Sequence, residues 1–154
     1  MQIPPPAWVI VTVCGLAAGG PACASLGGGI DTLRSDQQQL GGPARALAAA
    51  PAYTAHEIQV PGGGVVREYA AGGTVFAVTW HGPVRPDLQQ LLGQYFPAFQ
   101  QAVRGARESQ HRRGPLVLHQ PGLVIETGGH MRDFFGRAYL PDRLPAGVDM
   151  QELP

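Results

Sequence analysis

The adjacent pair His56 and Glu57 is the first combination of residues in this chain that could perform chemistry. In zinc proteases such a pair begins the helical motif His-Glu-x-x-His, in which the two histidines share one face of a helix and bind the metal. The position that would need the second histidine is Val60, and the surrounding residues favour a strand. The pair therefore does not form this motif.

The remaining histidines are spread along the chain, at His81, His111, His119 and His130. Metal sites in proteins need three or four converging ligands, and such ligands often include a pair that is close in sequence. No two histidines here lie within five residues of each other. We expect no metal and no cofactor, and the alternative is a site that the fold gathers from His56, His81 and His130.

Motifs for nucleophilic catalysis and phosphate binding are also missing. Serine is scarce, and no Gly-x-Ser-x-Gly sequence occurs. The run Gly62-Gly63-Gly64 lacks the lysine and the strand-to-helix context of a phosphate loop, so we interpret it as a hairpin turn. These observations assign no catalytic residue.

The segment that begins at Gly128 is the best candidate for ligand binding. Backbone amides freed by Gly128 and Gly129, together with His130, Arg132 and Arg137, could surround an anionic group. The structural alternative is a tight turn into the last strand, with both arginines paired to glutamates.

Short strands separated by glycine-rich turns must position these residues. The expected strands are residues 53–60, 65–70, 74–80, 116–119, 123–127 and 131–140. Strict alternation places Phe76, Val78 and Trp80 on one core-facing side of the third strand. Gly136 in the last strand indicates a bulge or a close backbone approach.

One amphipathic helix separates the two groups of strands. Asp87 is its expected cap, and apolar residues recur at helical spacing at Leu88, Leu91, Leu92, Tyr95, Phe96, Phe99 and Val103. The ring of Pro97 clashes with the carbonyl of Gly93, so we expect a kink at residues 93–97 and a charged loop from residue 104. The pattern predicts an α+β fold, βββ-α-βββ, in which one kinked helix packs on an antiparallel sheet made of two β-meanders.

The amino terminus predicts export. Residues 9–18 are an apolar run too short to cross a bilayer as a folded helix, and Ala-Cys-Ala at 22–24 fits cleavage before Ser25. We expect residues 1–24 to be removed as a signal peptide, which leaves a periplasmic or secreted bacterial protein with no membrane span. An uncleaved apolar anchor and a lipoprotein acylated at Cys23 are the alternatives.

The rest of the chain is predicted to be one small domain without disulfides. Both cysteines, Cys14 and Cys23, lie in the expected leader. Eleven arginines balance eleven acidic residues without a basic stripe, which argues against a nucleic-acid partner. The expected parts are a flexible segment at 25–52 with a short helix at 31–40, a linker with nothing to bury at 41–51, a single domain at 53–150 and a tail at 151–154.

Several sequence blocks together resemble a known family. They are YTAHE at 53–57, VREY at 66–69, VFAV at 75–78, Trp80, GP at 82–83, PDL at 86–88, LLG at 91–93, YF at 95–96, GGHMR at 128–132 and GRAYLP at 136–141. In combination they resemble an exported proteobacterial family known as domain of unknown function 2844. The resemblance implies export and a single small domain, and it supplies no activity, substrate or catalytic residue.

These observations lead to three hypotheses of function. The first is a non-catalytic periplasmic or secreted module that binds an unknown protein or small ligand of the cell envelope, through the sheet or through residues 128–141. The second is a hydrolase or metal-dependent enzyme that uses His56, Glu57 and His130. The third is a structural protein of the envelope that self-associates through an edge strand.

Overall fold

The computed structural model describes residues 26–30, 37–38, 40–47, 50–108 and 115–153. The expected signal peptide and most of the helix expected at 31–40 lie outside these residues. Of that helix, Gln37, Gln38 and Leu40 are described, and all three are helical.

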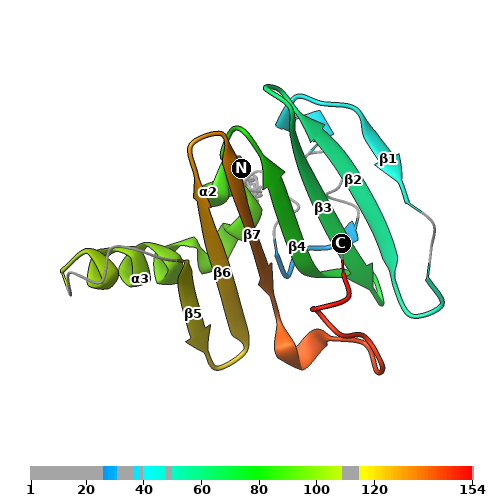
Figure 1. The fold of residues 1–154 in the computed structure, drawn as a ribbon. Coiled ribbons are helices and arrows are strands. Elements are labelled where there is room, and N and C mark those ends of the chain that lie inside the picture. The colour runs from blue at the N-terminus through cyan, green and yellow to red at the C-terminus, as the bar shows by residue number, and fades with distance from the viewer. Residues whose placement is uncertain (1–25, 31–36, 39, 48–49, 109–114, 154) are drawn as a thin grey trace, which may run out of the picture.

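Within the described residues, seven antiparallel strands form a single sheet in the order β1-β2-β3-β4-β7-β6-β5 (Figure 1). The strands are β1 (Ala44–Ala46), β2 (Thr54–Val60), β3 (Gly64–Ala71), β4 (Thr74–Gly82), β5 (Leu116–Gln120), β6 (Leu123–His130) and β7 (Asp133–Tyr139). Two meanders, β2-β3-β4 and β5-β6-β7, join where β4 pairs with β7. The predicted α+β class and the βββ-α-βββ order are confirmed.

The helical crossover between the meanders has three parts. They are α2 (Leu88–Leu92), a 3₁₀ turn at Gly93–Tyr95, and α3 (Phe96–Glu108). Asp87 caps α2, because its side chain accepts hydrogen bonds from the backbone amides of Gln89 and Gln90. The expected kink is confirmed as a full interruption at Gly93, whose φ of 49° suits glycine.

The predicted end of this helix at residue 104 is wrong, because α3 continues to Glu108. Arginine, glutamate and alanine are good helix formers, so the charged composition there was no evidence for a loop. In Figure 1, α3 extends beyond the edge of the sheet, and of its residues only Phe99 is buried.

Both faces of the sheet are packed, each against a different layer. On one face the crossover buries Leu88, Leu91, Leu92 and Phe99 against strand residues such as Ile125. On the other face the C-terminal segment, which starts with a 3₁₀ turn at Pro141–Arg143, crosses back over the sheet (Figure 1). There Met150 packs with Ala55, Tyr69, Phe76 and Ala77.

The predicted alternation along β4 is wrong at Phe76. Tyr69 pairs with Ala77 while Ala70 pairs with Val75, so Phe76 is an extra residue in β4. Such a β-bulge shifts the face on which the preceding side chains lie. Phe76 therefore packs in the C-terminal core, whereas Val78 and Trp80 face the helices.

Part of the segment expected as a linker at 41–51 is a strand of the sheet, and the three residues of that strand are exposed, in line with the expectation that this segment has nothing to bury. In β1, Ala44 pairs with Ile58 and Ala46 with His56. Upstream of β1, Leu26 and Leu40 are buried in the helix-side core. Alanine and glycine carry no alternating apolar pattern, which is why this strand has no signal in the sequence.

Candidate functional site

A row of polar side chains crosses the sheet on the face opposite the helices. In register from β1 to β6 the row consists of Arg45, Glu57, Arg67, Thr79, Arg137 and Glu126. Residues directly opposite each other in paired strands point to the same face of a sheet, so the six side chains lie side by side. Three guanidinium groups meet two carboxylates, and the row carries one more positive than negative charge.

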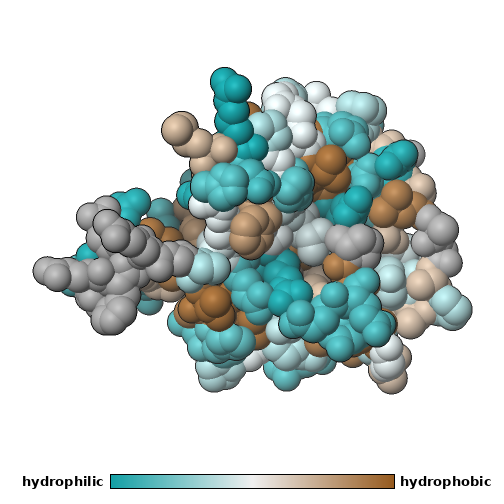
Figure 2. All heavy atoms as spheres, viewed as in Figure 1, coloured by the Kyte–Doolittle hydropathy of each residue, from teal (hydrophilic) through white to brown (hydrophobic). Residues whose placement is uncertain are grey.

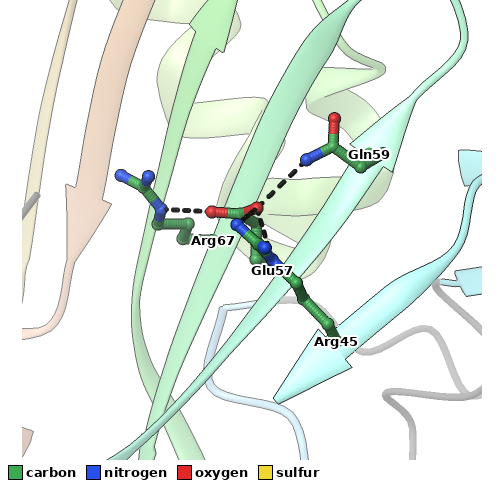
Figure 3. Close-up of polar contacts among 4 residues, drawn as sticks. All are labelled: Arg45, Glu57, Gln59 and Arg67. Carbon is green, nitrogen blue, oxygen red and sulfur yellow. Dashed lines mark hydrogen bonds and ion pairs between the residues drawn. The ribbon is translucent and has the colours of Figure 1, made fainter. Parts of the chain in front are cut away.

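Glu57 is the buried centre of one half of this row. Its side chain is 3% exposed and accepts from Arg45 Nη2 at 2.7 Å, Arg67 Nε at 2.9 Å and Gln59 Nε2 at 3.0 Å (Figure 3). Burial alone would raise the pKa of Glu57, but the hydrogen bonds from Arg67 and Arg45 outweigh it and hold that pKa below its ordinary value. Glu57 is therefore a permanently charged structural anion at neutral pH.

Arg137 and Glu126 form the matching pair in the other half. Arg137 donates from Nη2 at 2.7 Å and from Nε at 2.9 Å to the same oxygen of Glu126. Its Nη1 donates to the backbone carbonyl of Met150 at 3.0 Å. Arg137 thus fixes the C-terminal segment to the sheet, and its pair with Glu126 is the one that the structural alternative for this arginine describes.

Tyr69 connects the centre of the row to the C-terminal core. Its ring is buried, and its hydroxyl lies in hydrogen-bond contact with Thr79 and Arg67. Burial raises the pKa of Tyr69 above its ordinary value, more than these neighbours lower it. The phenol therefore stays protonated at neutral pH and acts as a neutral hydrogen-bonding group beside Arg67.

A groove of about 690 Å³ lies over the centre of the row. Arg67, Thr79 and Arg137 contribute its polar lining, together with His81 and Glu126. Its apolar lining includes Val65, Pro115, Val117, Phe135 and Leu153. Phe135 is 44% exposed and Val117 50% exposed, although both are large apolar residues. Apolar and hydrophilic patches also alternate over the surface in the view of Figure 2.

Arg67, Thr79 and Tyr69 are not among the site residues expected from the sequence. The expected strands at 53–60 and 65–70 imply a register that is off by one residue and would place Glu57 opposite Glu68, whereas in the structure Val60 pairs with Gly64 and Glu57 with Arg67. The pairing of β4 with β7, which brings Arg137 beside Thr79, has no signal in the sequence.

The two glycines of the predicted ligand segment serve packing in the structure. The ring of Phe135 lies against Gly128, where a Cβ would be 2.9 Å from the ring. Gly129 has a φ of 127°, and a Cβ there would be 2.3 Å from the carbonyl oxygen of Asp133. They also line a second cavity, of about 550 Å³, between α3 and the strands β5 and β6. A role of these glycines in binding stays a prediction.

His130 and Arg132 lie at the turn between β6 and β7. Arg132 has a φ of 63°, and it is the only non-glycine residue with positive φ in the described part of the chain. His130 Nε2 is 3.5 Å from one oxygen of Asp133, and His81 Nε2 is 3.0 Å from the other. Arg137 is in the middle of β7, so the five candidate residues do not converge on one point.

The structure does not assemble the alternative enzyme site. His56 and Glu57 are neighbours in β2 and therefore point to opposite faces of the sheet. His130 is at the far end of β6, beyond three intervening strands. Of the three candidate metal ligands, only His81 and His130 approach each other, and the described residues contain no group of three side chains that could hold a metal ion.

Comparison with known families identifies the family of the chain. A family model described as protein of unknown function (DUF2844) matches residues 22–153. Neither a curated protein nor a solved structure matches the chain. Among the described residues, no helix is long and apolar enough to span a membrane. Since the matched region is most of the sequence, the chain belongs to the DUF2844 family.

Proposed function

We propose that this protein is an exported, non-catalytic binding module that holds a small ligand in the groove over Thr79. The groove itself is the observation that carries the proposal. Small-molecule sites are typically concavities of about 300–1,000 Å³ with mostly apolar walls and a few placed polar groups. The volume of about 690 Å³ and the combination of Phe135 and Val65 with Arg67 fit that description.

The state of the polar groups supports a binding role over a catalytic one. A general acid or base works best when its pKa is near the working pH. The pKa of Glu57 is shifted downward and that of Tyr69 upward, each away from neutrality. Both groups are also occupied by hydrogen bonds to neighbouring side chains.

The leader pattern supports export. An apolar run at 9–18 followed by Ala-Cys-Ala at 22–24 is typical of a cleaved signal peptide. Export would place the groove in the cell envelope or outside the cell, where its ligand would be found.

Binding of the neutral fluorescent probe N-phenyl-1-naphthylamine tests the groove directly. The probe becomes fluorescent when it enters an apolar site, and we expect a saturable signal with the purified protein. In Val65→Glu a charge enters the apolar wall at a residue that lines this groove and not the cavity beside α3, so the affinity for the probe falls about tenfold or more. Val84→Glu is the matched control, since Val84 is 48% exposed outside the groove.

The results of the probe-binding test either support the groove or refute it. Loss of binding in Val65→Glu together with unchanged binding in Val84→Glu supports the groove. An absence of saturable binding by the unmodified protein, or an equal loss in both variants, would refute it. After long incubation a bound ligand must also be recovered chemically unchanged by mass spectrometry, and conversion to a product would contradict a non-catalytic role.

A further inference from the structure

We infer that the ligand of the groove is an amphipathic monocarboxylate, whose carboxylate lies over Thr79 between Arg67 and Arg137. This inference rests on the proposed binding function and specifies the chemical class of the ligand. It follows from the charge of the polar row, the orientation of Arg67 and the separation of polar from apolar groups in the groove.

The charge of the row is the first argument. Arg45 and Arg67 share Glu57, whereas Arg137 has Glu126. One guanidinium charge is therefore left without a carboxylate of its own, and the half of the row with two arginines is the one that contains Arg67. A ligand with a single negative charge would make the sum of the charges of the row and the ligand zero, which favours a monoanion over a dianion.

The orientation of Arg67 is the second argument. An arginine has five N–H donors in a rigid fork. Arg67 directs its Nε to Glu57, and Figure 3 shows its terminal nitrogens on the side away from that carboxylate. Arg67 also contacts the hydroxyl of Tyr69, and its side chain is 31% exposed. Donors on its terminal nitrogens are therefore available to a carboxylate in the groove.

The spacing of the two arginines is the third argument. Arg67 in β3 and Arg137 in β7 both pair with Thr79 in β4, so one strand separates them. Neighbouring strands are about 4.8 Å apart, which places the two Cα atoms about 10 Å apart. Two arginine side chains can both reach an anion located above the residue between them. Arg137 already donates to Glu126 and Met150, so Arg67 is the principal contact.

The apolar groups define the rest of the ligand. In the adjacent register row, Val65 and Phe135 flank His81, and both line the groove. Val117 and Leu153 continue the apolar lining. A ligand with its carboxylate above Thr79 would extend over these side chains, so its body must be apolar. A medium-length fatty acid has this combination.

Competition by a matched pair of ligands tests the inference. Decanoate and decanol have equal chain lengths and differ in charge, and each is used to displace N-phenyl-1-naphthylamine. We expect decanoate to bind about tenfold or more tightly than decanol, because a hydrogen bond to a charged group is stronger than one to a neutral group. In Arg67→Gln the ratio of the two affinities falls to about one while the affinity for decanol is unchanged.

Two controls keep the result interpretable. Arg85→Gln removes an arginine that lies over the ring of Phe134, outside this groove, and must retain the preference for decanoate. If Arg67→Gln does not fold, the double variant Glu57→Gln/Arg67→Gln removes both partners and must show the same loss. Equal binding of decanoate and decanol by the unmodified protein would overturn the inference and leave the proposed function standing. Failure of both ligands and of the probe to bind would refute the proposed function itself.

Discussion

Arg67 donates its Nε hydrogen to Glu57 across the β2–β3 pair, at a distance of 2.9 Å. This bond holds a partly exposed guanidinium by means of a buried carboxylate. Glu57 is thus a positioning residue for Arg67, and the two together link the stability of the sheet to the polar lining of the groove.

Replacement of Glu57 by glutamine is expected to destabilise the protein by about 3 kcal/mol. Removal of one partner from a buried ion pair costs about 3–5 kcal/mol, and the exposure of both arginines reduces that cost. Denaturant unfolding followed by circular dichroism measures the change. Arg45→Ala serves as the control, since Arg45 is 67% exposed and such a pair contributes about 1 kcal/mol or less. Equal losses in the two variants would contradict the central role of Glu57.

Acid is expected to lower the free energy of unfolding of the protein, because Glu57 becomes protonated. The pKa of Glu57 is lower in the folded protein than in the unfolded chain, where a glutamate titrates at about 4.3. Its contribution is therefore present above that pH and is lost as the pH falls through the folded pKa. Unfolding at a series of pH values measures this. The stability difference between the unmodified protein and Glu57→Gln must shrink below about pH 4; a constant difference would be inconsistent with a lowered pKa.

The substitution Gly136→Ala is expected to destabilise the protein by about 2–3 kcal/mol, as overpacking of a core does. A Cβ at residue 136 would be 2.2 Å from the indole ring of Trp80 and 2.8 Å from the carbonyl oxygen of Glu126. Gly105→Ala is the same change in an exposed part of α3, where a Cβ meets nothing within 4 Å. It is expected to stabilise by about 0.5–1 kcal/mol. Thermal unfolding compares the two variants, and a shift in the same direction would refute this explanation.

Elements that depend on local sequence patterns were predicted, whereas strand pairings and the bulge that depend on tertiary contacts were not. A bulge or a close backbone approach was expected at Gly136, and in the structure the nearest group is a side chain, the ring of Trp80. Turn glycines and the helical spacing of Leu88, Leu91 and Leu92 are local signals, and the elements that they predict are present. The pairing of β1 with β2 and the bulge at Phe76 depend on tertiary context, and local patterns gave no indication of either.

The candidate site was less accessible to prediction for the same reason. Most of the residues expected to bind a ligand lie at 128–132, where unusual residues are consecutive. The polar row instead takes one residue from each strand, and its members are as far apart in sequence as Arg45 and Arg137. The separation of His56 from Glu57 follows from strand alternation, which the predicted strand already implied.

Processing of the amino terminus is a further prediction. When the full chain is produced in a bacterium, mass spectrometry of the envelope fraction is expected to give a protein that begins at Ser25. Substitution of Ala24 by a bulky residue such as arginine blocks cleavage and retains the precursor. An unprocessed or lipid-modified mass for the unmodified chain would contradict this prediction and would leave the ligand-binding prediction to be tested separately.

The most direct test of a carboxylate site over the polar row is an amide-resolved NMR titration of the protein with decanoate. We expect saturable chemical-shift changes that are largest at Val65, Thr79 and Phe135, and that are lost in Arg67→Gln. Shifts concentrated at Phe99 and Val103, in the cavity beside α3, or no saturable shifts at all, would contradict a binding site over the polar row.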